Sequence, residues 1–350
     1  MKRMEERTFE FLPDLRLGLV GPRQQLRHFD AEYGRVRTQA GGAVDARVEL
    51  GPLDPRGRAG GHKTARWTVE LGTPTEVPLT ARIGVRGLPA SFALSLVQGY
   101  FVEPLLSLAA ASAGYVLLPA AAIADGDDAV VLMGRSRSGK STVSARALAA
   151  GVPILGDDQV ILDGAGNCAP FPRRLRFYSD LRETAPDAFR RLPTYPRTGL
   201  HIRRLVKRVT RGFISPPVRV PISVLGPPAR AGWRRISGVI VIERDAALDE
   251  LGRGSVDAEH VAKAAEELLD GQRERFAQVA GPEWIAPLGV ASERERSTVR
   301  AAFGSVSVER LALPGSWPAP RAIDALAQAL GISGPRSGVP PRADAPQGGS

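Results

Sequence analysis

One short stretch of the chain combines two glycines, a lysine and a serine at a spacing suited to binding phosphate. Gly134, Gly139, Lys140 and Ser141 fit the pattern G-x-x-x-x-G-K-[ST]. Glycines let backbone N–H groups turn inward around phosphate oxygens, and the positive end of a following helix adds to the attraction. A lysine ammonium is a compact, mobile charge that reaches the β- and γ-phosphates, and a serine hydroxyl ligates Mg²⁺. The motif therefore predicts binding of a nucleoside triphosphate with Mg²⁺.

The surroundings of this motif favour the same interpretation. The apolar run "AVVLM" precedes it and the helix-forming run "STVSARALAA" follows it, as a strand–loop–helix unit requires. The lysine is also conspicuous, because the chain has only five lysines against 42 arginines. We expect the other residues in and beside the motif to contact the nucleotide as well: Arg135, Ser136, Arg137, Ser138 and Thr142.

A pair of acids follows the motif at a distance that the geometry of a βαβ unit explains. A helix from Lys140 to Ala150 travels about 16 Å away from the phosphates, and an extended strand from Pro153 to Asp157 returns about 16 Å. A right-handed crossover then brings Asp157 and Asp158 back level with the loop. There, one carboxylate can hold Mg²⁺ and the other can accept a proton from an attacking hydroxyl. The alternative is that the pair is only a turn after a strand.

Residues 115–163 resemble the HPr serine kinase/phosphorylase family and its smaller relatives, which include the lasso-peptide kinases. The matching stretches are "YVLLPAAAIADGDDAVVLMGRSRSGKST" and "ALAAGVPILGDDQVIL". The "LGDD" after the loop is also similar to ATP-dependent phosphoenolpyruvate carboxykinase, to which the family is related. The resemblance is close over this segment and covers the remainder of the chain only in outline.

This resemblance implies an α/β fold, with a P-loop domain of the HPr kinase/carboxykinase type, and an ATP-dependent phosphotransferase with an alcohol group as acceptor. The resemblance also implies that Asp157 is the general base for the acceptor hydroxyl. Asp158 and Ser141 then bind the metal ion, and Lys140 takes part in catalysis. The triphosphate cradle is formed by Gly134, Ser136, Ser138, Gly139, Lys140 and Ser141.

The chain departs from the family pattern at three positions. Pro119 stands where bifunctional members have a histidine, Thr142 where they have a glutamate, and Arg137 replaces the middle glycine of the loop. The first two departures leave open whether the chain catalyses phosphorolysis and whether HPr is its acceptor. Arg137 either contacts phosphate or points into solvent.

Composition indicates a soluble protein in a reducing compartment. Hydrophobic residues make up 43% of the 350 residues, and the single cysteine, Cys168, excludes a disulfide framework. No signal peptide is recognisable at the start, and Gln98, Glu103 and Pro104 interrupt the apolar residues between 90 and 124. We therefore expect a cytoplasmic protein without a membrane partner.

Charge is concentrated in a basic segment at residues 171–235. Fifteen arginines and Lys207 stand there against three acids, a net charge of +13, while the remaining chain carries −3. Such a segment indicates an anionic partner or a solvated surface. In "HIRRLVKRVTRGF", helical spacing places Arg204, Lys207, Arg208 and Arg211 on one face, suited to an acidic substrate or to the nucleotide. In "RLRFYSDLR", Phe177 and Tyr178 either stack on bases or pack beside ion pairs.

Hydrophobic periodicity predicts the order of the elements. A β-rich N-terminal lobe occupies residues 1–88, with strands at 43–51, 65–72 and 79–87. The P-loop domain, residues 89–334, begins with a helix re-angled near Pro104, continues as strand–turn–strand over 115–133, and includes the basic segment 171–235, whose first part is loop-rich. Further strands are predicted at 218–226, 235–244 and 305–314, helices at 257–279 and 321–331, and a disordered tail at 335–350.

The sequence favours an ATP-dependent kinase acting on a serine-like hydroxyl of a peptide, a protein or a small metabolite, and the basic segment leaves an acidic acceptor as an option. Two alternatives stay open. One is a carboxykinase-like enzyme, and the other is a non-catalytic nucleotide switch or a module that binds nucleic acid through its basic segment. The identity of the acceptor, the choice of ATP or GTP and the formation of a homo-oligomer are not fixed by the sequence.

Overall fold

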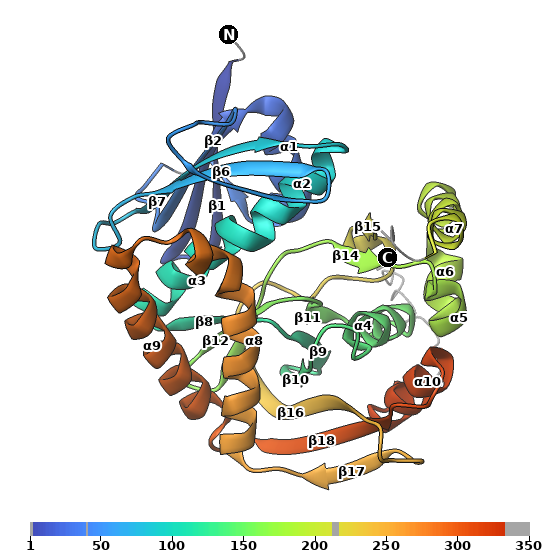
Figure 1. Ribbon diagram of the computed structural model, residues 1–350. Helices are drawn as coiled ribbons and strands as arrows, with labels where there is room; N and C mark the ends of the chain where they lie inside the picture. Colours follow the sequence, from blue (N-terminus) through green and yellow to red (C-terminus); the bar gives the residue numbers. More distant parts are fainter. Residues whose placement is uncertain (1–2, 40, 212–216, 333–350) are drawn as a thin grey trace, which may run out of the picture.

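The computed structural model describes residues 3–39, 41–211 and 217–332. In this part of the chain the fold is mixed α/β, with a seven-stranded sheet, a nine-stranded sheet and a two-stranded sheet. Figure 1 shows the first sheet at the top and the second below it, with helices around the second. The predicted α/β class is confirmed. The tail predicted to be disordered, residues 335–350, lies outside the described residues.

The first sheet is built from the N-terminal residues. Its strands are, in spatial order, β3 (Arg37–Thr38), β1 (Met4–Leu12), β2 (Leu15–Pro22), β4 (Ala46–Gly51), β7 (Leu79–Arg86), β6 (Ala65–Leu71) and β5 (Arg58–His62). The strands predicted at 43–51, 65–72 and 79–87 correspond to β4, β6 and β7. The structure adds the hairpin β1–β2, helix α1 (Arg23–Tyr33) and a 3₁₀ turn (Gly34–Val36), which the sequence did not predict.

A broken apolar helix joins the two sheets. It consists of α2 (Ala90–Val97), a π-helical turn (Gln98–Val102) and α3 (Glu103–Ser112). The predicted change near Pro104 corresponds to the π-helical turn, which directly precedes α3 and its Pro104. Residues 90–112 have the length and composition of a membrane-spanning helix, but 72% of the apolar window is buried inside the fold.

The second sheet holds the phosphate-loop motif. Its main path is β11 (Ile154–Gly156), β9 (Ala121–Asp125), β10 (Asp128–Met133), β16 (Arg234–Asp245), β13 (Asn167–Pro170), β12 (Val160–Asp163) and β8 (Tyr115–Leu118), with β18 (Ser307–Pro314) beside β16 and β17 (Gly252–Ser255) beside β18. Strands β10, β16 and β18 run parallel to one another. The predicted strand–turn–strand over 115–133 is three strands, because the chain turns at Pro119 between β8 and β9.

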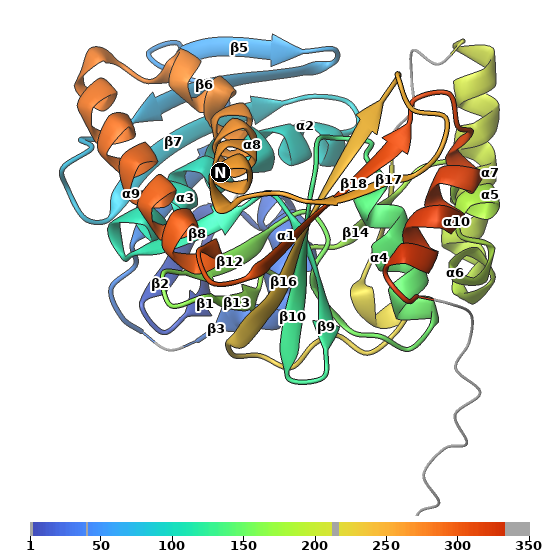
Figure 2. The same ribbon diagram turned by 90° about the horizontal axis from the view of Figure 1, so that it is seen from below.

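Helices cover both faces of this second sheet. On one face α4 (Lys140–Ala149) and α10 (Ala319–Ala329) bury Leu148 and Ile323 against strand residues such as Leu311. On the other face α8 (Ala258–Val279) and α9 (Ile285–Phe303), joined by a 3₁₀ turn (Pro282–Trp284), bury Leu269 and Phe303. Figure 2 shows the two helical layers on opposite sides of β10, β16 and β18. Helix α8 was predicted, and α9 was not.

The basic segment is more regular than the sequence suggested. It contains β14 (Leu175–Phe177), α5 (Leu181–Thr184), α6 (Pro186–Arg191), α7 (Thr194–Val209), β15 (Val218–Val220) and a 3₁₀ turn (Ile222–Val224). The prediction of a loop-rich stretch was therefore wrong for residues 175–209. The strand predicted at 218–226 ends at Val220, because Pro221 has no N–H to continue the pairing with β14.

Candidate functional site

The phosphate-loop motif joins the end of β10 to the start of α4, as its pattern predicts. Gly139 has φ of 110°, a conformation that favours glycine, and a Cβ placed there would lie 2.6 Å from Ile323 Cδ1. At Gly134 a Cβ would lie 2.6 Å from the carbonyl oxygen of Ile242. Gly134 is thus required by a backbone contact and Gly139 by its backbone conformation. The first turn of α4 has no side-chain cap and no acid, so its N–H groups remain suited to an anion.

Lys140 folds back over this loop. Its ammonium donates hydrogen bonds to the carbonyl oxygens of Gly134 and Arg135, the second at 3.2 Å, and to Ser138 Oγ at 3.4 Å. Burial lowers the pKa of Lys140, and the charges of Asp158 and Asp157 oppose that shift. The lysine and both acids therefore interact electrostatically in the folded chain.

The other residues of the motif are placed differently. Arg135 is exposed and pairs with Glu267 of α8 at 2.9 Å, and Ser136 is exposed. Arg137 is exposed and adopts φ of 69°, the left-handed region that non-glycine residues rarely occupy. Thr142 lies in the first turn of α4, where its N–H donates to the Gly139 carbonyl at 3.1 Å. Arg135 thus faces α8 rather than the centre of the loop.

The acid pair returns to the same edge of the sheet as the loop. Strand β11 is antiparallel to β9, which is antiparallel to β10, so β11 runs parallel to β10 with β9 between them. A tight turn follows at Gly156, where a Cβ would lie 2.0 Å from the carbonyl oxygen of Gln159. Asp157 and Asp158 therefore follow β11 at the edge of the sheet where β10 enters the loop, as the crossover geometry predicts.

Asp157 is the buried member of the pair. Its exposed fraction is 5%, and burial raises its pKa to about 7, with a further contribution from Asp158. The nearby hydroxyls of Ser144 and Ser141 and the Lys140 ammonium act in the opposite direction. Within the described residues, Asp157 Oδ1 is buried without a hydrogen-bond partner of good geometry, and so is Ser144 Oγ. A buried carboxylate oxygen without a partner is costly unless something else binds it.

Asp158 points toward arginines of the basic segment. Its side chain is 41% exposed and forms ion pairs with Arg173 at 3.1 Å and with Arg176 at 3.4 Å. Arg173 is almost fully buried and also pairs with Glu103 of α3 at 3.3 Å. The two neighbouring acids therefore occupy unlike surroundings, one beside hydroxyls and the other beside guanidinium groups.

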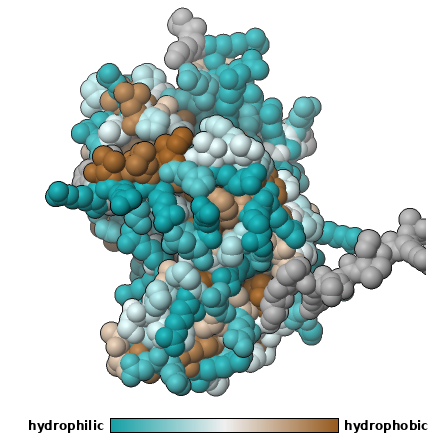
Figure 3. Space-filling view, turned by 90° about the vertical axis from the view of Figure 1, so that its right-hand side faces the viewer, coloured by the Kyte–Doolittle hydropathy of each residue, from teal (hydrophilic) through white to brown (hydrophobic). Residues whose placement is uncertain are grey.

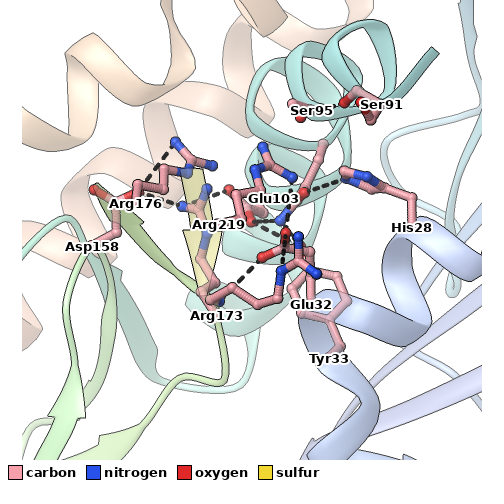
Figure 4. A network of polar contacts seen from close by, with 12 residues as sticks. His28, Glu32, Tyr33, Ser91, Ser95, Glu103, Asp158, Arg173, Arg176 and Arg219 are labelled. Atoms are coloured by element: carbon pink, nitrogen blue, oxygen red, sulfur yellow. Dashed lines mark hydrogen bonds and ion pairs between the residues drawn. The ribbon is translucent and has the colours of Figure 1, made fainter. Parts of the chain in front are cut away.

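A buried polar network extends from Asp158 to the first sheet, as Figure 4 shows. Glu103 accepts hydrogen bonds from the Tyr33 hydroxyl at 2.7 Å and from Gln98 Nε2 at 2.8 Å. Glu32 of α1 lies 2.8 Å from Arg219 Nη1 of β15. Burial raises the pKa of Glu103, and Arg173 opposes the shift. Sequence reasoning missed this network, although Gln98 and Glu103, two polar residues inside an apolar run, were a signal that a partner had to be buried with them.

The basic face predicted on one helix is found on α7, except for Arg211. The helix ends at Val209, and Arg211 lies beyond it with φ of 48°. Arg204 pairs with Glu183 at 2.7 Å. The exposed face of α7 also carries the apolar side chains of Ile202, Leu205 and Val209. Figure 3 looks onto the side of the molecule that carries α7 and shows apolar atoms among hydrophilic ones.

Two histidines have polar contacts within the fold, and the two aromatic residues that the sequence left open differ in burial. His28 lies 2.8 Å from Gln98 Oε1, and burial, with Arg219 second, lowers its pKa to about 4. His260 lies 3.4 Å from Glu243. Phe177 is buried in the core, whereas Tyr178 is 48% exposed. The aromatic pair is thus split between the core and the surface.

A separate groove of about 830 Å³ runs between the first sheet and α9. Its lining includes Val77, Leu108, Trp284 and Val290 and shares no residue with the loop or the acid pair. The groove is therefore separate from the loop and the acid pair.

A comparison with protein-family models and with curated proteins finds no match to the chain. The family resemblance thus depends on the motif residues themselves.

Proposed function

We propose that the chain is an ATP-dependent, Mg²⁺-requiring kinase that transfers the γ-phosphate to a hydroxyl of a peptide, a protein or a small metabolite. The finer fold that goes with this proposal is a P-loop kinase domain of the HPr kinase type, with the first sheet as its N-terminal lobe. One observation supports it above the others: β11 runs parallel to β10 and returns the acid pair to the edge of the sheet that carries the loop and the uncapped N-terminus of α4. The charges of Asp157 and Asp158 also act to raise the pKa of Lys140 against the effect of burial.

The residues around the loop fit a triphosphate. The first N–H groups of α4 have no side-chain cap, and the helix dipole favours negative charge there. Lys140 adds a full positive charge on a mobile stem. The contacts of Lys140 within the loop are to backbone carbonyls and one hydroxyl, which are weaker partners than phosphate oxygens.

The residues also fit a magnesium ion. Magnesium is commonly held by one or two carboxylates, a hydroxyl and phosphate oxygens rather than by an all-protein cage. Ser141 and Asp158 would hold it here. Within residues 3–39, 41–211 and 217–332 no three His, Cys, Asp or Glu side chains gather into a cluster. Bound Mg²⁺·ATP supplies the transferable phosphoryl group and neutralises charge on it.

Asp157 is suited to accept the proton of the acceptor hydroxyl. A general base works best when its pKa lies near the pH at which it acts, and burial raises the pKa of Asp157 to about 7. Asp157 would orient the hydroxyl for in-line attack and take its proton as the new oxygen–phosphorus bond forms, while the bond from the γ-phosphorus to the β–γ bridging oxygen breaks and ADP leaves.

Transfer of a γ-label from ATP tests this function. The chain is incubated with γ-labelled ATP and Mg²⁺ together with panels of hydroxyl compounds and peptides, and labelled products are separated. A carboxykinase-like activity would instead produce phosphoenolpyruvate from oxaloacetate and nucleotide. Tight ATP binding with no labelled product would favour a non-catalytic switch, and RNA or DNA affinity that falls steeply with salt would favour a nucleic-acid module on α7.

A further inference from the structure

Two arginines face each other across the two-stranded sheet of the basic segment. Strands β14 and β15 are antiparallel, and Arg176 is the direct partner of Arg219 in their register. Directly opposed residues project to the same side of a sheet, and like charges at such positions destabilise the pairing. The residues that flank them, Leu175 and Val220, are buried. The arginine pair therefore needs negative charge beside it.

The protein supplies only part of that charge. Asp158 lies 3.4 Å from Arg176, and Glu32 lies 2.8 Å from Arg219. Four arginines share three carboxylates in this network, namely Arg173, Arg174, Arg176 and Arg219 against Glu32, Glu103 and Asp158. In addition, the Nε atoms of Arg173, Arg174 and Arg176 are buried without a hydrogen-bond partner among the described residues. The network thus has one positive charge and three N–H donors in excess.

The position of Asp158 makes this excess depend on the proposed metal. Asp158 is the counter-ion of both Arg173 and Arg176 and is also the carboxylate proposed to hold Mg²⁺. A carboxylate that binds a divalent cation neutralises neighbouring guanidinium groups less. Loading of the site would therefore leave Arg176 and Arg219 more strongly attractive to a second anion.

We propose that Arg176 and Arg219 form a subsite for an anionic group on the acceptor, a carboxylate or a phosphate, so that the acceptor is an acidic hydroxyl compound. This inference rests on the proposed kinase function and names its substrate class. Guanidinium groups bind carboxylates and phosphates through paired N–H donors, which gives both affinity and orientation. The subsite adjoins Asp158, and therefore the acid pair, so an anion held there brings its hydroxyl to Asp157.

Tyr178 supports this placement. It follows β14 directly, is 48% exposed, and interacts electrostatically with Asp158, with Arg137 of the loop and with Arg219. Tyr178 is therefore within electrostatic range of both Arg137 and Arg219. Its exposed surface offers a wall for the carbon skeleton of an acceptor bound by its anionic group.

Binding of inorganic phosphate to the nucleotide-loaded chain tests the subsite without requiring turnover. The phosphate loop is first saturated with Mg²⁺ and a non-hydrolysable ATP analogue, and phosphate is then titrated by calorimetry. We expect Arg176→Gln to weaken phosphate binding by about 10-fold or more, because charge-assisted hydrogen bonds are lost. Arg176→Lys should lose less of the affinity for phosphate. Arg253→Gln, which removes an exposed arginine paired with Glu309, should leave the affinity for phosphate unchanged.

The outcomes separate this inference from the function on which it rests. Failure of the unaltered chain to bind the analogue would overturn the kinase proposal itself. Analogue binding together with phosphate affinity that is equal in Arg176→Gln and the parent would overturn only the subsite. Weaker analogue binding in Arg176→Gln, with phosphate binding preserved, would assign the arginine to the nucleotide and also overturn the subsite. Arg176 is partly exposed, and thermal unfolding of each variant checks that it folds.

Discussion

The guanidinium of Arg173 lies 3.1 Å from the carboxylate of Asp158, and the same nitrogen lies 3.3 Å from Glu103. Arg173 and Glu103 are buried, so this contact links the acid pair to α3 through a region from which water is excluded. An ion pair in such a place contributes little by its presence, but its disruption leaves charges without compensation. The candidate site and the first sheet are therefore coupled through one side chain.

Arg173→Met should destabilise the fold strongly. Removal of one partner of a buried ion pair typically costs about 3–5 kcal/mol, and here Glu103 would stay buried without its cation. Urea unfolding followed by circular dichroism measures the change. Arg253→Met, at an exposed ion pair, is the matched control and should leave the midpoint unchanged. Equal midpoints for Arg173→Met and the parent would show that the buried pair is not needed for stability.

Gly139→Ala should impair both stability and nucleotide binding. The added Cβ would meet Ile323 Cδ1 at 2.6 Å, and alanine would have to adopt φ of 110°, a strain of about 1–3 kcal/mol. Gly271→Ala is the control, since this glycine lies within α8 with no atom near its Cβ position, and alanine there should stabilise by about 0.5–1 kcal/mol. Thermal unfolding compares the two, and a stabilising Gly139→Ala would contradict the loop geometry.

Lys140→Ala should weaken ATP binding by about 10- to 100-fold, because charge-assisted hydrogen bonds to phosphate are lost. Calorimetric titration with Mg²⁺·ATP provides the measurement. Lys263→Ala removes an exposed lysine of α8 and should bind ATP like the parent. If Lys140→Ala bound ATP with unchanged affinity, the loop would not be a phosphate site.

The pKa of Asp157 predicts how stability depends on pH in the absence of metal and nucleotide. Burial raises this pKa from 3.8 to about 7, so between these values the folded chain binds a proton that the unfolded chain does not. The stability that this bound proton contributes to the folded chain is therefore fully present below the unfolded pKa and is lost as pH rises through about 7. The parent should lose stability relative to Asp157→Asn over this range in urea titrations at several pH values. Parallel profiles of stability against pH for the parent and Asp157→Asn would mean that the pKa of the Asp157 carboxyl is not raised in the folded chain.

Local patterns in the sequence were sufficient to predict the loop, the helix after it and the return of the acids. The motif identifies the loop by its glycines, its lysine and its serine. The length of the helix after the loop equals the length of the strand that returns, so the loop, the helix and the position of the acids all follow from one short segment. The insertion of β9 between β10 and β11 did not follow, because pairing order is decided by contacts distant in the chain. Helix α9 was missed because Pro287 and Gly289 near its start conceal its periodicity.

The arginine network was beyond prediction for a different physical reason. In a chain with 42 arginines, composition does not distinguish Arg173, which is buried, from Arg190, which is exposed. Strands β14 and β15 are three residues each, too short for an alternating pattern, and their pairing joins segments far apart in the chain. Buried Glu103 was the usable signal, since a carboxylate in an apolar helix requires a cation nearby.

Transfer of the γ-phosphate by Asp157→Asn tests whether Asp157 is the general base of a kinase. γ-Labelled ATP and Mg²⁺ are supplied to the parent and to the variant with acidic hydroxyl acceptors, and nucleotide affinity is measured in parallel. We predict that the parent transfers label and that Asp157→Asn binds ATP with similar affinity but transfers about 10²- to 10⁴-fold more slowly. Transfer by Asp157→Asn at the parent rate, or ATP binding by the parent with no transfer to any acceptor, would contradict the account.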